Sequence, residues 1–222
     1  SSRIRSMNNT THPFDEATWA QLPTLLENLP EPVHIILWGD PAASEAEKET
    51  AVLLQSLTDR FSQLTYQVLP RRINYHYYPV LGVMGGPAED WHDFGVRLIG
   101  LPNGYAMTSF ITAVQAVSFR GMTLEAMTRI KLKQLTQPVS IELFSAADNE
   151  AGALMAQPLF SMAVVNEHIR TFFVMTDQFP TAVDRYSLNY LPHMVINQRV
   201  HLEGVVGEEE ILKQIATAVK TT

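Results

Sequence analysis

The 222-residue sequence contains no cysteine. A chain without thiols has no disulfide, thiolate metal site, cysteine nucleophile or dithiol redox couple of its own. Positive charge is also scarce, because 16 Lys and Arg stand against 23 Asp and Glu, which gives a formal net charge of −7. The basic residues form only short groups such as Arg71-Arg72. Nucleic-acid binding needs a concentrated basic surface, so we expect no nucleic-acid partner.

Long hydrophobic runs are missing as well, since no apolar stretch approaches the roughly 20 residues that a membrane-spanning helix needs. Residues 1–11 are mostly polar. We therefore predict a cytoplasmic protein without a membrane partner. We interpret residues 1–6, which precede Met7, as an expression leader. Apolar residues make up 46 % and charged residues 18 % of the chain, a balance typical of globular proteins rather than disordered ones.

The chain does contain an internal repeat. Residues 32–38 (Pro-Val-His-Ile-Ile-Leu-Trp) recur as residues 138–144 (Pro-Val-Ser-Ile-Glu-Leu-Phe), and both stretches predict a buried strand. Each copy continues with a helix, a strand, a proline-led strand, another strand and a helix. The expected ranges are 44–61, 64–69, 78–84, 95–99 and 105–117, then 149–165, 168–175, 191–196, 200–203 and 208–220. Ser44 and Glu47 form a capping-box pair, and further helices are expected near 15–29 and 123–135.

Two segments are too specific to arise from apolar periodicity alone. They are residues 95–105 (Gly-Val-Arg-Leu-Ile-Gly-Leu-Pro-Asn-Gly-Tyr) and 162–169 (Met-Ala-Val-Val-Asn-Glu-His-Ile). With residues 191–197 (Leu-Pro-His-Met-Val-Ile-Asn), they resemble the tandem-thioredoxin module at the N-terminus of the flavoprotein subunit of bacterial alkyl hydroperoxide reductase. The related archaeal glutaredoxin-like protein disulfide oxidoreductases are similar in the same way.

This resemblance implies an α/β fold of two tandem thioredoxin-like, or glutaredoxin-like, units. Their mixed β-sheet is expected to be flanked by helices and packed as one rigid body. The implied divisions are a leader and N-terminal helix at 1–30, a first unit at 31–120, a linker helix at 121–136 and a second unit at 137–222. The resemblance also implies a cis bond before Pro192, and it leaves the bond before Pro79 open.

Departures from the family pattern determine which function we expect. The family carries Cys-x-x-Cys at the start of the helix in its second copy. This sequence has Asp148-Asn149-Glu150-Ala151 there, or Asn149-Glu150-Ala151-Gly152 if the alignment slips by one residue. Ala106 stands where the family has a conserved acid. Because the whole turn and a distant acid differ, natural loss of redox function is the simpler explanation.

Other chemistry at the degenerate turn remains open. A thioredoxin fold would bring His193 close to Asp148, Glu150 and Ser145, which could form a hydrolase-like site or hold a divalent metal. The alternative is that Asp148 or Asn149 caps the helix while His193 lies in an exposed loop. We assign no catalytic residue and no metal ligand. For residues 75–78, which contain three tyrosines, an aromatic binding site and a half-buried strand are both open.

We therefore expect a redox-inactive binding or scaffold module without a cofactor, and not a thiol–disulfide oxidoreductase on its own. Its partner would be a protein or an extended peptide, held by β-augmentation. The expected binding residues are Leu191, Pro192, His193, Tyr77, Tyr78 and Pro79. The resemblance also implies an accessory role beside a peroxiredoxin or a flavoprotein reductase. An enzyme with a non-thiol site at His193, Asp148 and Glu150 is the alternative. The sequence does not predict the oligomeric state.

Overall fold

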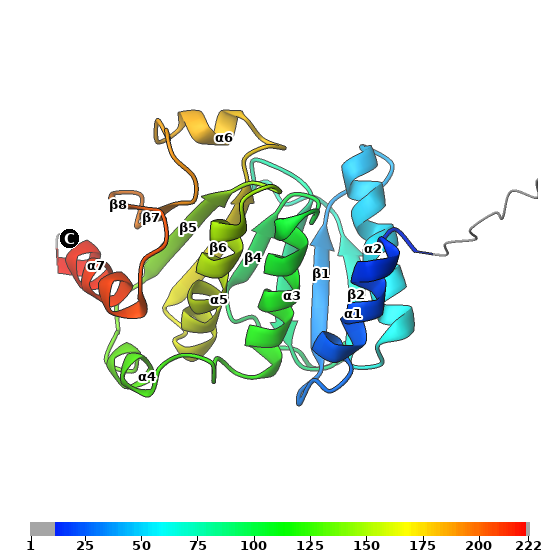
Figure 1. The fold of residues 1–222 in the computed structure, drawn as a ribbon, viewed down its shortest axis with the longest axis horizontal. Coiled ribbons are helices and arrows are strands. Elements are labelled where there is room, and N and C mark those ends of the chain that lie inside the picture. Colours follow the sequence, from blue (N-terminus) through cyan, green and yellow to red (C-terminus); the bar gives the residue numbers. More distant parts are fainter. Residues whose placement is uncertain (1–11, 221–222) are drawn as a thin grey trace, which may run out of the picture.

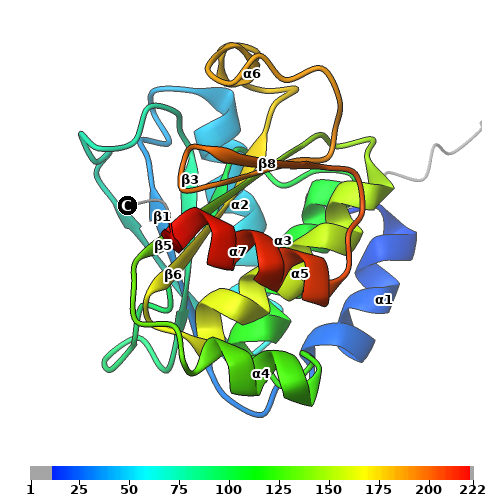
Figure 2. The same cartoon turned by 90° about the vertical axis from the view of Figure 1, so that its left-hand side faces the viewer.

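The computed structural model describes residues 12–220, and the interpretation of residues 1–6 as a leader lies outside them. Its centre is a mixed sheet of eight strands in the order β2-β1-β3-β4-β6-β5-β7-β8. Figure 1 shows the sheet with the long helices in front of it, and the turned view in Figure 2 shows these helices gathered on one side. Within residues 12–220, no helix is long and apolar enough to cross a membrane.

The order of elements in each copy follows the pattern that the sequence predicts. After α1 (Glu16–Leu26), the first copy consists of β1 (Val33–Trp38), α2 (Glu45–Arg60), β2 (Leu64–Leu69), β3 (Val80–Gly85), β4 (Val96–Ile99) and α3 (Tyr105–Ser118). After α4 (Ala126–Leu132), the second consists of β5 (Val139–Ser145), α5 (Glu150–Val165), β6 (Ile169–Met175), α6 (Thr181–Asp184), β7 (His193–Ile196), β8 (Val200–Glu203) and α7 (Glu208–Lys220). Only α6 was not expected.

The two copies share one continuous sheet. Strands β4 and β6 pair in parallel, from Val96 opposite Thr171 to Ile99 opposite Val174. The first copy has the order β2-β1-β3-β4 and the second the order β6-β5-β7-β8, so the second repeats the first along the sheet. This arrangement confirms the predicted α/β fold with a mixed sheet. The division into domains at particular residues stays a prediction.

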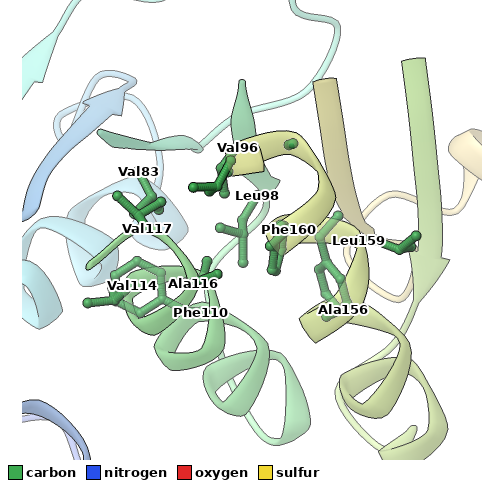
Figure 3. Packing of buried hydrophobic residues seen from close by; sticks show 14 of the residues in the cluster. Val83, Val96, Leu98, Phe110, Val114, Ala116, Val117, Ala156, Leu159 and Phe160 are labelled. Atoms are coloured by element: carbon green, nitrogen blue, oxygen red, sulfur yellow. The ribbon is translucent and has the colours of Figure 1, made fainter. Parts of the chain in front are cut away.

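The main core lies between the sheet and its helices. Figure 3 shows α3 and α5 side by side, with Phe110 and Phe160 packed below Leu98 of β4. Both helices are buried over most of their surface, because each contacts the sheet and also the other helix. This packing explains why both carry apolar residues nearly all the way round rather than on one stripe.

The opposite face of the sheet has a smaller buried cluster that includes Trp38, Phe144 and Val195. No long helix contributes to this cluster. Instead, the loop at residues 70–79 and the segment at 176–191, which contains α6, pack against it. These two segments occupy equivalent positions in the repeat, each between a parallel strand and the proline-led strand.

Candidate functional site

The two proline segments, residues 78–79 and 191–192, lie at the same end of the strands, the upper end in Figure 1. Strands β3 and β7 run antiparallel to β1 and β5, so each begins where its neighbour ends. Val80 pairs with Trp38, and His193 pairs with Phe144. The peptide bonds before Pro79 and Pro192 are both cis, which confirms the expectation for Pro192 and answers the open question for Pro79.

The turn after β5 is built to begin a helix. Asn149 is the N-cap of α5, and its Oδ1 accepts a hydrogen bond of 2.9 Å from the N–H of Gly152. This contact satisfies one of the free N–H groups of the first helical turn. The structure therefore confirms the capping alternative, with Asn149 rather than Asp148 as the cap. It also places Asn149 and Gly152 one helical turn apart, as two residues of a Cys-x-x-Cys motif would be.

Ser145 and Gly152 fit together behind this turn. The Ser145 hydroxyl is buried and has no hydrogen-bond partner within residues 12–220. A Cβ added to Gly152 would overlap Ser145 Oγ and lie 2.6 Å from Ser145 Cβ. Ser145 therefore fills the space that any side chain at position 152 would need.

The turn is also held from the first copy. The N–H of Tyr105, at the start of α3, donates a 2.8 Å hydrogen bond to the carbonyl oxygen of Ala147. Gly104 permits this approach, because it has a φ of 53° and a Cβ at this position would overlap the same oxygen. The Gly-Tyr pair that ends the specific segment at residues 95–105 thus positions the degenerate turn.

The matching turn of the first copy is closed by an ion pair between the buried Glu47 and the half-exposed Arg71. Ser44 Oγ donates to Glu47 Oε2 at 2.6 Å and accepts from the Glu47 N–H at 3.2 Å, which confirms the capping box. Arg71 binds both Glu47 oxygens, at 2.9 and 2.5 Å, and the Asp40 N–H adds a third partner. Burial alone would raise the pKa of Glu47, but the hydrogen bonds from Arg71, Ser44 and Asp40 outweigh it and lower this pKa. The carboxylate is fully engaged within the fold.

His193 does not occupy the position that either interpretation gave it. It is the first residue of β7, is 5 % exposed, and its Nε2 lies 2.7 Å from His201 Nδ1. Its Nδ1 lies 3.8 Å from Glu203 Oε1. Burial and the neighbouring His201 lower the pKa of His193, against a smaller opposing effect of Glu203. The exposed-loop expectation was wrong because the β7–β8 pairing covers this side chain.

The hydrolase-like or metal-binding constellation does not form either. His193 has no hydrogen bond or ion pair with Asp148, Glu150 or Ser145, and its polar partners come from β8. Among residues 12–220, no group of three or more His, Asp or Glu side chains could hold a metal ion. The structure therefore gives the enzyme alternative no support.

The segment before Pro192 offers free backbone groups. Within residues 12–220, the N–H and carbonyl of Leu191 form no hydrogen bond. The pairing of His193 with Phe144 places Leu191 beside the start of the turn. Four exposed apolar side chains, which the sequence alone did not single out, lie at the start of α3, in the first turns of α5, before β7 and after β8. They are Tyr105, Leu154, Tyr190 and Val205, which we call the apolar rim.

The first-copy tyrosines lie in an irregular loop, not in a strand, because β3 begins only at Val80. Tyr77 Oη lies 3.0 Å from Thr181 Oγ1, and its ring lies 4.8 Å from that of Phe179. Tyr78 packs under Arg71, with the guanidinium carbon 5.1 Å from the ring centre. The half-buried-strand interpretation was wrong, and Tyr77 is engaged with the second copy. A binding role for Tyr77, Tyr78 and Pro79 stays a prediction.

Comparison of the sequence with known proteins gives two relatives of the same name. No protein-family model matches the chain. The alkyl hydroperoxide reductase subunit AhpF of Pseudomonas aeruginosa is 26 % identical over 200 residues, which cover 89 % of this chain and 36 % of that protein. The Pseudomonas putida protein of the same name is 24 % identical over 205 residues, 92 % of this chain and 38 % of that protein. The chain thus spans less than two-fifths of the curated relatives that it matches.

Two solved structures share the fold along most of their length. One is the NTD_N/C domain of alkylhydroperoxide reductase AhpF from Enterococcus faecalis, with a TM-score of 0.81, 20 % identity, and 91 % of this chain and 99 % of that chain covered. The other is a protein disulfide oxidoreductase from Aeropyrum pernix, with a TM-score of 0.78, 19 % identity, and coverage of 95 % and 96 %. The tandem thioredoxin-like fold is therefore confirmed, in a chain that contains no cysteine.

Proposed function

We propose that this chain is a redox-inactive, thioredoxin-like binding module that holds an extended segment of a partner protein beside Leu191. The observation that carries the proposal is the backbone of Leu191, which is unpaired within residues 12–220 and lies next to the turn where the family pattern has Cys-x-x-Cys and this chain has no thiol. A free N–H and carbonyl on an exposed segment can accept a strand from another chain. The chain has no thiol, while the unpaired Leu191 backbone that supports the proposal is present within residues 12–220.

The apolar rim supports a protein partner. Tyr190, Val205 and Leu154 are each more than half exposed, and Tyr105 stands at the start of α3. Three contacts bring the segments that carry these residues around one place. Gly204 lies against the Tyr190 ring, the Val206 N–H lies 3.3 Å from Met155 Sδ, and Tyr105 binds Ala147. Exposed aromatic and aliphatic side chains grouped around a free backbone are typical of protein interfaces.

We further propose that the module is accessory to a peroxide-reducing system and that its partner is a peroxiredoxin or a flavoprotein reductase. The relatives that support this setting are named as one subunit of alkyl hydroperoxide reductase, and this chain matches over a third of their length. Without a thiol, the chain cannot relay electrons between such proteins. Its contribution would be to hold or position the partner.

The test is a binding titration with the purified peroxiredoxin and flavoprotein reductase of the source organism. We expect Leu191→Asp to raise the dissociation constant at least tenfold, because a charge at the proline segment opposes docking of an apolar strand. Tyr190→Asp should act in the same direction, and it changes a side chain that is mostly exposed. Val52→Asp, on the exposed side of α2, is the matched control and should leave binding unchanged.

Thermal unfolding of each variant separates loss of binding from loss of the fold. The proposal is wrong if neither protein binds the folded wild-type chain. It is equally wrong if a partner binds and both folded variants, Leu191→Asp and Tyr190→Asp, retain the wild-type affinity. In the latter case the partner would dock elsewhere on the molecule.

A further inference from the structure

A cavity of about 330 Å³ lies on the sheet face opposite the long helices, where the two copies meet. Its walls include the rings of Tyr75, Tyr77, Phe144 and Phe172 and the charged groups of Glu142 and Arg185, and His76 also lines it. Tyr75, His76 and Tyr77 belong to the first-copy loop, and the other four residues belong to the second copy. This volume falls at the lower end of the range for pockets that bind small molecules.

Contacts within the first copy and between the copies hold the aromatic walls of the cavity in place. Tyr77 is fixed by its hydrogen bond to Thr181 and by packing on Phe179. The Tyr75 hydroxyl accepts a 3.0 Å hydrogen bond from Nε of the buried Arg97, and its ring packs on Trp38 at a centroid distance of 5.7 Å. Because both tyrosines are held in place by other groups, a ligand would enter a largely preformed site.

Glu142 gives the cavity its polarity. Its side chain is 15 % exposed, and its Oε1 accepts a 2.7 Å hydrogen bond from the Tyr186 hydroxyl. Burial, and then the Glu142 carboxylate, raise the pKa of Tyr186, so this hydroxyl stays a donor. Oε2 lies 3.6 Å from Arg185 Nη1, which is beyond hydrogen-bond distance. Within residues 12–220, this oxygen therefore has an ion-pair neighbour but no hydrogen-bond donor.

We propose that this cavity binds a flat, uncharged aromatic molecule with an N–H or O–H donor at its edge, of the indole or phenol class. The four aromatic rings match a flat apolar body. Within residues 12–220, Glu142 Oε2 accepts no hydrogen bond, so a donor on the ligand would give this largely buried carboxylate a second partner. The single carboxylate and the single guanidinium balance each other, which favours a neutral ligand. The lining of this site does not include Leu191 or Pro192, and the proposal does not depend on the proposed function.

The test compares indole with benzofuran, which has a similar shape but no N–H donor. Binding is followed by NMR titration of the folded wild-type chain. We expect indole to bind at least fivefold more tightly than benzofuran and to shift signals of Phe172 and Tyr75. Glu142→Gln should remove most of this preference while benzofuran binding changes little. Phe172→Ala should weaken both ligands, because it removes a wall of the cavity.

Glu150→Gln, at an exposed position on α5, is the matched control and should bind indole like the wild type. The proposal is overturned if indole does not saturate the protein at millimolar concentration, or if benzofuran binds as tightly as indole. It is also overturned if folded Glu142→Gln keeps the full preference for indole. Circular dichroism of each variant establishes that it is folded before binding is compared.

Discussion

Gly152→Ala should destabilise the protein, although alanine is the better residue for a helix. In an exposed helix, this substitution would stabilise by about 1 kcal/mol. Here the new Cβ would overlap Ser145 Oγ and lie 2.6 Å from Ser145 Cβ. Rotation of the hydroxyl relieves only the first contact, so the backbone of β5 or α5 must also shift.

The size of the effect follows from these two opposing contributions. Overpacking of a buried site typically costs about 1–3 kcal/mol. After subtraction of the helix-propensity gain, we expect a net loss of about 0–2 kcal/mol in the free energy of unfolding. For a chain of 222 residues, this loss corresponds to a fall of up to roughly 8 °C in the melting temperature.

The assay is chemical denaturation of a double-mutant cycle. Ser145→Gly in the Gly152→Ala background removes both contacting atoms, so the two substitutions should couple favourably by about 1 kcal/mol or more. Ser145→Ala alone removes a buried hydroxyl that lacks a partner among residues 12–220 and should be neutral or slightly stabilising. If Gly152→Ala is instead about 1 kcal/mol more stable than the wild type, as in an exposed helix, and shows no coupling to Ser145→Gly, Ser145 does not restrict position 152 and the reasoning fails.

Two further predictions concern buried titratable groups. The pKa of His193 in the folded state lies below its ordinary value of 6.5. The neutral side chain therefore contributes its full stability above pH 6.5, and this contribution is lost as the pH falls through the folded-state pKa. Denaturation between pH 8 and 5 should show this loss, and a His193→Gln variant with an equally steep loss would contradict it. Glu47→Gln should cost about 1–3 kcal/mol by the same assay, because it weakens the hydrogen bonds with Arg71. Glu45→Gln, at an exposed position, is the control. An equal loss of stability in the two variants would refute the role of the Glu47–Arg71 pair.

The repeat made most of the fold predictable from sequence. Its two buried strands, the helix caps and the proline-led strands depend on local signals, and Ser44 and Asn149 both cap helices in the structure. The four-residue helix α6 carries no comparable local signal. Its position depends on contacts with the first copy, such as Tyr77 with Thr181, and these join residues 104 positions apart in the sequence.

The candidate site was predictable only in part for the same reason. The position of the turn followed from its alignment with the family, and Asn149 is a residue type that favours N-caps. The partner of His193 depends on strand register, because β7 and β8 pair Val195 with His201 and His193 with Glu203. A hairpin interpretation of residues 193–203 could have found this pair of histidines. The cavity at Glu142 needs both copies in place, and no local pattern indicates it.

The head-to-tail order of the copies has a consequence for assembly. In the repeat, the free edge strand β8 is equivalent to β4, and the free edge strand β2 is equivalent to β6. If β8 of one molecule paired with β2 of the next, as β4 pairs with β6 inside the molecule, the contact would be heterologous and would add further molecules without end. The outer helices disfavour such growth, because α7 begins with three glutamates and α2 begins with the exposed Glu45, whereas Glu47 is paired with Arg71. Repulsion between these acidic helix starts would oppose pairing of the two free edges.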